Sequence, residues 1–189
     1  NETGKKKEIT YRQLMKNVNK LGNLFREAGL KEGDTVLVII PRLIEAYQVY
    51  IAALKIGAVV IPSSEMLKAK DLQYRINHGN VTAVVCYEPF TGEFSGMPEA
   101  EKLKLFSVGG RAEGWSDVDE QMAPMSDKLE AADTLRDDMA FLAYTSGTTG
   151  NPKGVVHTHG WAFAHLHTAA ENWLGITEGA VVWATAAPG

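Results

Sequence analysis

Ten consecutive residues, 145–154, combine side chains and backbone freedom that suit a site for phosphate groups. They read Thr-Ser-Gly-Thr-Thr-Gly-Asn-Pro-Lys-Gly. Glycines allow tight turns and close approach to a ligand, and successive N–H groups in such a turn form a concave site for anions. The four hydroxyls can donate hydrogen bonds to phosphate oxygens, and Lys153 adds a positive charge on a long side chain. The segment therefore predicts a cradle for a polyphosphate.

The segment differs from the Walker A loop, G-x-x-x-x-G-K-[ST], at two positions that matter. With Gly147 as the first glycine and Lys153 as the lysine, Pro152 stands in place of the second glycine. Gly154 then stands in place of the hydroxyl that binds magnesium. Proline has a fixed φ and no N–H to donate. A P-loop NTPase is therefore disfavoured.

Apolar runs separated by helical patterns surround this loop. The run 139–144 predicts a buried strand that leads directly into it, and the short run 155–157 predicts a returning strand. Further strands are predicted at 36–40, 58–61, 81–87, 102–108 and 181–184. Helical spacing and helix-ending glycines predict helices at 10–28, 43–56, 68–78 and 161–173. Residues 88–100 are expected to form a loop, and 109–136 a polar surface excursion with one short helix.

Strands that alternate with helices predict an α/β fold with a mostly parallel sheet and helices on both faces. Ligands of such sheets bind beyond the carboxyl ends of the strands. The segment 145–154 leaves the carboxyl end of a predicted strand, so its position agrees with its chemistry.

Composition narrows the classes of function. The chain has 189 residues, 45% of them hydrophobic, which is enough to bury a core. Its formal net charge of −4 argues against non-specific nucleic-acid binding. It contains no run of eighteen apolar residues, so no transmembrane helix is predicted. The single cysteine, Cys86, lies in an apolar strand-like run and is expected to be buried, which fits a cytoplasmic location.

Residues 144–155 resemble the signature of the adenylate-forming superfamily without a mismatch. This superfamily comprises acyl-CoA synthetases, peptide-synthetase adenylation domains and luciferases. Segments 9–14, 30–36 and 54–62 are similar to structural motifs of the same superfamily. Segments 71–76 and 183–189 are closest to acetyl-CoA and medium-chain acyl-CoA synthetases. The alternative for 145–154 is a surface turn rich in Ser, Thr and Gly that binds no ligand.

The resemblance implies an enzyme that joins a carboxylic acid, expected to be a fatty acid, to coenzyme A at the expense of ATP and with Mg²⁺. ATP would first convert the acid to an acyl-adenylate and release pyrophosphate, and the thiol of coenzyme A would then displace AMP. The catalytic residues would be Thr148 and Lys153. The residues implied to contact the β- and γ-phosphates are Thr145, Ser146, Gly147, Thr148, Thr149, Gly150 and Lys153.

Several parts of the family pattern do not occur in this sequence. They are the motif for adenine and magnesium, the aspartate for ribose, the hinge, and the C-terminal domain with its catalytic lysine. Residues 1–189 are therefore expected to be a partial N-terminal AMP-binding domain, inactive alone and with exposed apolar faces. Two alternatives stay open: a non-catalytic module that binds a nucleotide or acyl group, and a ligase of the same superfamily with another acceptor.

Histidines and tryptophans follow the loop. The H-x-H spacing of His157, His159, His165 and His167 suggests a metal site, but no cysteine or nearby carboxylate completes one, so no metal is expected. His159 falls where the family has a Thr-His pair and is expected to make a structural hydrogen bond. Trp161 and Trp173 are expected to anchor the core. Trp183 is expected to lie in the core or to touch the acyl pocket.

Overall fold

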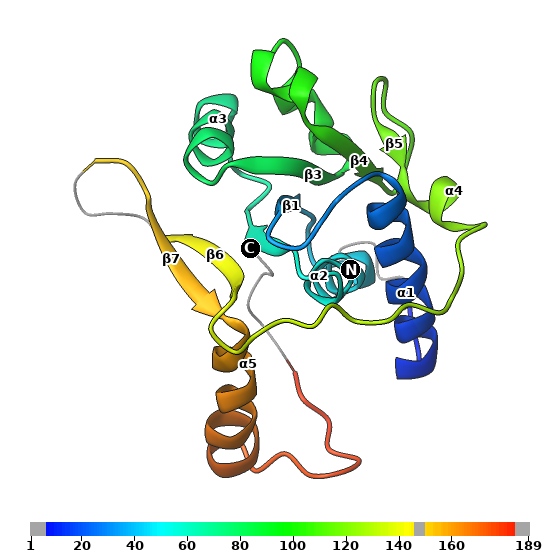
Figure 1. Cartoon of the computed structure of the whole chain (residues 1–189), viewed down its shortest axis with the longest axis vertical. Helices are drawn as coiled ribbons and strands as arrows, with labels where there is room; N and C mark the ends of the chain where they lie inside the picture. The colour runs from blue at the N-terminus through cyan, green and yellow to red at the C-terminus, as the bar shows by residue number, and fades with distance from the viewer. Residues whose placement is uncertain (1–6, 146–149, 184–189) are drawn as a thin grey trace.

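The computed structural model describes residues 7–145 and 150–183, and within them it contains one seven-stranded sheet (Figure 1). The strand order is β5-β4-β3-β1-β2-β6-β7. Neighbouring strands run parallel except β7, which is antiparallel to β6. The strands are β1 Thr35–Ile39, β2 Val59–Pro62, β3 Val81–Tyr87, β4 Lys104–Val108, β5 Ser116–Asp117, β6 Met139–Thr145 and β7 Lys153–Thr158. The predicted α/β class with a mostly parallel sheet is confirmed.

Helices cover both faces of the sheet, as the sequence predicts. On one face lie α1 (Tyr11–Glu27), α2 (Ile44–Lys55) and α4 (Val118–Met122). On the other lie α3 (Ala69–His78) and the 3-10 helices η1 (Glu88–Phe94) and η2 (Pro98–Lys102). Successive residues of β1 face opposite sides: Val36 and Val38 pack with the first group of helices, and Leu37 and Ile39 with the second. A central strand buried on both faces requires the continuous apolar run that the sequence shows.

The first helix, α1, begins where the sequence places its capping box. The Gln13 amide donates to the Thr10 hydroxyl at 3.2 Å, and the Thr10 amide donates to the Gln13 side-chain oxygen at 3.1 Å. Val18, Leu21 and Phe25, spaced by three and four residues, are buried against the sheet.

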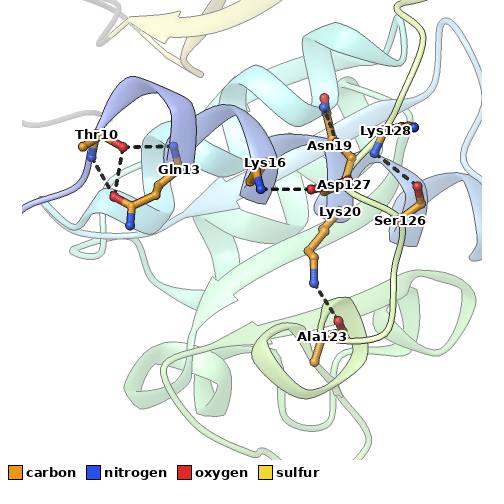
Figure 2. A network of polar contacts seen from close by, with 9 residues as sticks. All are labelled: Thr10, Gln13, Lys16, Asn19, Lys20, Ala123, Ser126, Asp127 and Lys128. Carbon is orange, nitrogen blue, oxygen red and sulfur yellow. Dashed lines mark hydrogen bonds and ion pairs between the residues drawn. The ribbon is translucent and has the colours of Figure 1, made fainter.

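A segment that we call the strap, residues 123–132, carries the chain across α1 from the β5 edge towards β6 (Figure 1). Polar side chains of α1 bind mainly its backbone, and Lys16 Nζ also lies 3.4 Å from a carboxylate oxygen of Asp127 (Figure 2). Asn19 Nδ2 donates to the carbonyl of Asp127 at 2.7 Å, and Lys20 Nζ donates to that of Ala123 at 2.7 Å (Figure 2). The predicted polar excursion at 109–136 is thus held on the helix surface.

Further contacts hold the middle and the end of the strap. Asn23 Nδ2 lies 2.8 Å from the Ser126 carbonyl oxygen and 2.9 Å from that of Lys128. The Ala132 amide donates to the carbonyl of Lys55, the last residue of α2, at 2.8 Å. These donors fix the path of a segment that has no regular secondary structure of its own.

Two sequence expectations about local structure are wrong. Residues 88–100 contain the 3-10 helices η1 and η2, each with a proline in its first turn, where proline's fixed φ and missing N–H are tolerated. Residues 181–183 lie in no strand within the described part of the chain, and Ala184 falls outside it. Val181 is 96% exposed there, so its β-branched side chain gains no burial from a neighbouring strand.

The last helical segment is less buried than the sequence suggests. It consists of α5 (His159–His165) and a π-helical stretch, η3 (Leu166–Trp173), of which Ala169 is the one buried residue. Trp173 is 82% exposed and Trp161 is 44% exposed, so the prediction that both anchor the core is wrong. Trp183 is 87% exposed and is not a core residue either. Its start contacts β7 and the segment before β6, whereas Phe163, Leu166 and Trp173 further along stay mostly exposed.

Candidate functional site

The loop that is predicted to bind a polyphosphate connects β6 to β7, at the carboxyl end of β6 as predicted. The final register pair of the hairpin is Thr145 opposite Lys153, so these two side chains flank the mouth of the loop. Both are exposed, as is Gly150, whose φ of +93° lies in the region that glycine adopts without strain. Four predicted contact residues fall outside the described part of the chain: Ser146, Gly147, Thr148 and Thr149.

The two stems of the loop contact the same helix, α3. On the incoming side, the Tyr144 hydroxyl lies 2.8 Å from His78 Nδ1. On the outgoing side, the Tyr74 hydroxyl donates to the Pro152 carbonyl at 3.0 Å. The Tyr74 and His78 rings stack on each other with centroids 5.3 Å apart, and the His78 and Tyr144 rings pack edge to face at 5.6 Å.

Arg75, on the same helix, completes this group. Its guanidinium lies 5.2 Å from the centre of the Tyr144 ring, and its Nη1 donates to the Asp71 carbonyl at 3.1 Å. Burial lowers the pKa of Arg75 and raises the pKa of Tyr144. Tyr144 therefore stays protonated at neutral pH, so that its hydroxyl can exchange a hydrogen bond with His78.

Sequence reasoning missed the role of Tyr74 and His78. The available signal was their spacing of four residues on a predicted helix, which puts two rings on one face. Their partners Tyr144 and Pro152 are 66 and 78 residues away along the chain, and only the folded topology brings them together.

The histidines after the loop are engaged with aromatic rings. Trp161 lies between His157 and His165, at centroid distances of 4.6 and 5.1 Å. His167 Nδ1 lies 3.0 Å from a Glu171 carboxylate oxygen. Within residues 7–145 and 150–183, no three His, Cys, Asp or Glu side chains gather in a way that could hold a metal ion.

The expected side-chain hydrogen bond of His159 is not found. Its Nε2 atom is buried and has no hydrogen-bond partner among the described residues. Its backbone amide instead donates to the Asp138 carbonyl at 3.0 Å, which ties the start of α5 to the segment before β6. His159 thus helps to hold the start of α5 through its backbone amide.

A hollow of about 810 Å³ lies at the amino ends of three strands. Its lining includes Thr35, Val59 and Met139, the first residues of β1, β2 and β6. Lys153 lies beside the opposite end of β6. This hollow is therefore not the predicted phosphate site.

The chain was compared with known protein families and structures. The profile of the family described as AMP-binding enzyme matches residues 2–188. The chain belongs to this family. It is 54% identical over 188 residues to a protein of Bacillus subtilis (strain 168) named the uncharacterized acyl-CoA ligase YtcI, covering 100% of this chain and 35% of that protein. It is 32% identical over 174 residues to the mouse mitochondrial acyl-coenzyme A synthetase ACSM3, covering 90% of this chain and 30% of the relative.

Solved structures of AMP-binding enzymes share the fold. The anthranilate CoA ligase AuaEII, solved with anthranoyl-AMP, matches with a TM-score of 0.84 and 25% identity over 88% of this chain and 33% of that one. ATP-bound MatB from Rhodopseudomonas palustris matches with a TM-score of 0.79 and 25% identity, over 89% of this chain and 33% of that one. The chain thus spans about a third of the length of the relatives it matches. The resemblance inferred from residues 144–155 is confirmed at the level of family and fold.

No helix among residues 7–145 and 150–183 is both long enough and apolar enough to cross a bilayer.

Proposed function

We propose that this chain supplies the pyrophosphate-binding part of an AMP-forming acyl-CoA synthetase. The observation that carries the proposal is the pairing of Thr145 and Lys153 at the mouth of a glycine- and hydroxyl-rich loop, in a chain of the AMP-binding enzyme family. The loop leaves the carboxyl end of a strand in a parallel sheet, the end at which such sheets bind ligands.

The reaction would proceed in two steps. A carboxylate oxygen attacks the α-phosphorus of ATP, a P–O bond to the β-phosphate breaks, and pyrophosphate leaves. The thiolate sulfur of coenzyme A then attacks the acyl carbon, and AMP leaves with the electrons of the broken C–O bond. The first step places negative charge on the departing pyrophosphate, and donors aimed at those oxygens lower its barrier.

The loop residues are suited to this electrostatic task. Thr145, at the end of β6, and Gly150 would face the β- and γ-phosphates, and exposed Lys153 would bring its ammonium group to them. Thr148 would donate its hydroxyl to the same oxygens, with Ser146, Gly147 and Thr149 completing the cradle. Mg²⁺, which would arrive bound to ATP, adds positive charge at the phosphates. The described residues gather no carboxylate set for it, so its protein ligands would lie elsewhere.

The names of the relatives support our proposal for the substrates. Names such as acyl-coenzyme A synthetase support a carboxylic acid, a fatty acid in our proposal, with ATP and coenzyme A as co-substrates. Residues 1–189 would form part of the N-terminal AMP-binding domain of the enzyme, because the matched relatives are about three times longer. A cytoplasmic location is proposed from the single cysteine, Cys86, which is buried and unpaired by a disulfide.

The test is acid-dependent exchange of pyrophosphate into ATP by the full-length protein, with short, medium and aromatic carboxylates and a few amino acids. We expect exchange with a fatty acid, and a loss of roughly 100- to 1000-fold in Lys153→Ala, the range for removing one donor to developing charge. Lys31→Ala, which removes an exposed lysine beside the far end of the sheet, is the matched control and should keep full activity.

Two outcomes would contradict the proposal. Folded protein that binds ATP but exchanges with no acid would indicate a non-catalytic nucleotide-binding module. Exchange that Lys153→Ala leaves unchanged would mean that the loop does not contact the phosphates.

A further inference from the structure

We propose that Tyr74 and His78 of α3 are positioning residues that set the placement of the phosphate loop, a role that rests on the function proposed above. We call these two side chains the α3 clamp. The clamp would act through the loop's two stems, on which Thr145 and Lys153 sit, rather than by touching ATP.

The clamp holds one point on each side of the loop. Tyr144, the residue before Thr145, meets His78 Nδ1 through its hydroxyl at 2.8 Å. Pro152, the residue before Lys153, accepts the hydroxyl of Tyr74 at 3.0 Å. Proline has no N–H, so its carbonyl is the one polar backbone group through which this stem residue can be held. Both residues that flank the loop mouth are therefore one peptide bond away from an anchored neighbour.

The two halves of the clamp form one unit. Tyr74 and His78 lie one helical turn apart and stack with an interplanar angle of 25°. Tyr144 packs edge to face on both, at 6.1 Å from Tyr74 and 5.6 Å from His78. A shift of either ring would therefore disturb the other stem as well.

Glycine at 154 permits this close approach. Gly154 pairs with Tyr144 across the hairpin, and a Cβ built on it would lie 2.9 Å from Leu142 Cδ1 and 3.6 Å from His78 Cε1. An added Cβ would crowd the Leu142 side chain and would meet His78 at ordinary van der Waals distance. Gly154, within the family signature, thus packs between Leu142 and the clamp.

The loop end of the hairpin extends beyond the strand pairing that joins it to the rest of the sheet. The hydrogen-bonded register between β2 and β6 consists of one pair, Val60 with Phe141, which lies four residues before Thr145. Beyond that point, Val155 and Val156 of β7 are both exposed. Electrostatic catalysis requires donors held in place before the reaction, and a displacement of about 1 Å can cost roughly 100-fold in rate. The contacts to α3, together with the packing of Leu142 and Tyr144 against the core, restrain the loop end of the hairpin.

The experiment compares ATP with AMP in the full-length protein. Because the loop would contact the β- and γ-phosphates, which AMP lacks, loosening the clamp should weaken ATP binding selectively. Tyr74→Phe keeps the ring and removes the hydrogen bond to Pro152. His78→Phe keeps an aromatic ring and removes the bond to Tyr144. We expect each variant to raise the Kd for ATP, by calorimetric titration, roughly 2- to 10-fold, the range for one lost hydrogen bond, and to change the Kd for AMP less than twofold.

Tyr11→Phe is the control, because Tyr11 is 91% exposed and lies at the start of α1, outside both α3 and the hairpin. Melting temperatures of all variants check that the fold is retained. Equal weakening of ATP and AMP, or no change in either, would overturn the clamp. Wild-type protein without acid-dependent exchange would overturn the proposed function, whereas normal exchange with unchanged ATP affinity in both variants would overturn the clamp alone.

Discussion

The body of the sheet and the β6–β7 hairpin are built in opposite ways. In β1, at the centre of the sheet, all five residues are buried, and helices cover both faces. In β7, at its edge, Val155 is 40% exposed and Val156 is 49% exposed. The body gains its stability from burial, which is non-directional. The hairpin is placed by a few directional contacts, so stability and the proposed chemistry reside in different parts of the molecule.

The largest expected effect tests whether stability belongs to the body. Phe25 is fully buried and packs edge to face on Phe106 at 5.3 Å. Phe25→Ala should lower the free energy of unfolding by about 3–5 kcal/mol, through lost transfer energy and the cavity left behind. Phe163→Ala removes a phenylalanine that is 67% exposed on α5. This substitution should change the free energy of unfolding by less than about 0.5 kcal/mol. Urea titration measures the free energy of unfolding of both variants. Equal losses in Phe25→Ala and Phe163→Ala would contradict the claim that stability comes from the buried body of the sheet.

The second test uses the reactivity of the thiol in the body. Cys86 is buried in β3, and desolvation raises its pKa from 9.0 to about 12. Because the thiolate is the reactive form, labelling with a disulfide reagent at pH 8 should be at least roughly 100-fold slower in the folded protein than in urea. Fast labelling of the folded protein would show that β3 often unfolds locally and exposes Cys86 to the reagent.

The same difference between the buried body and the hairpin explains how well the sequence predicts each of them. The helices α1 to α3 and the strands β1 to β4 were predicted, since buried strands leave continuous apolar runs and α1 carries a capping box at Thr10, whereas η1, η2 and β5 were not. The hairpin was located because its loop signature is specific. Its anchoring by Tyr74 and His78 was not predicted, because those contacts join residues distant in sequence. The prediction that Trp173 lies in the core was wrong because hydrophobic spacing identifies the apolar face of a helix. It does not identify the element that packs on that face.

A third test concerns how the strap is attached to the body. Asn23→Ala removes a side chain that donates to two strap carbonyls, and should lower the free energy of unfolding by roughly 1–2 kcal/mol. Hydrogen exchange should show faster amide exchange at 126–132 and unchanged rates in β1. Asn172→Ala, on the exposed η3 segment, is the matched asparagine and should leave both regions as they are.

The smallest expected effect concerns the start of α1. Thr10→Ala removes the hydroxyl that accepts from the Gln13 amide, and should cost about 1 kcal/mol of stability, as for other N-caps. Thr177→Ala, an exposed threonine beyond the last helix, should have no measurable effect. Thermal unfolding resolves this difference, and an unchanged midpoint in Thr10→Ala would mean that packing alone fixes the beginning of α1.

The way α1 holds the strap has a consequence for how this protein can evolve. Asn19, Lys20 and Asn23 all donate to main-chain carbonyls, which every amino acid presents. Substitutions in 123–130 therefore leave these bonds available, whereas an insertion or deletion moves the carbonyls out of register with the donors. Apart from Met125 and Leu129, which pack against the core, homologous sequences should vary in composition along this segment while keeping a constant length.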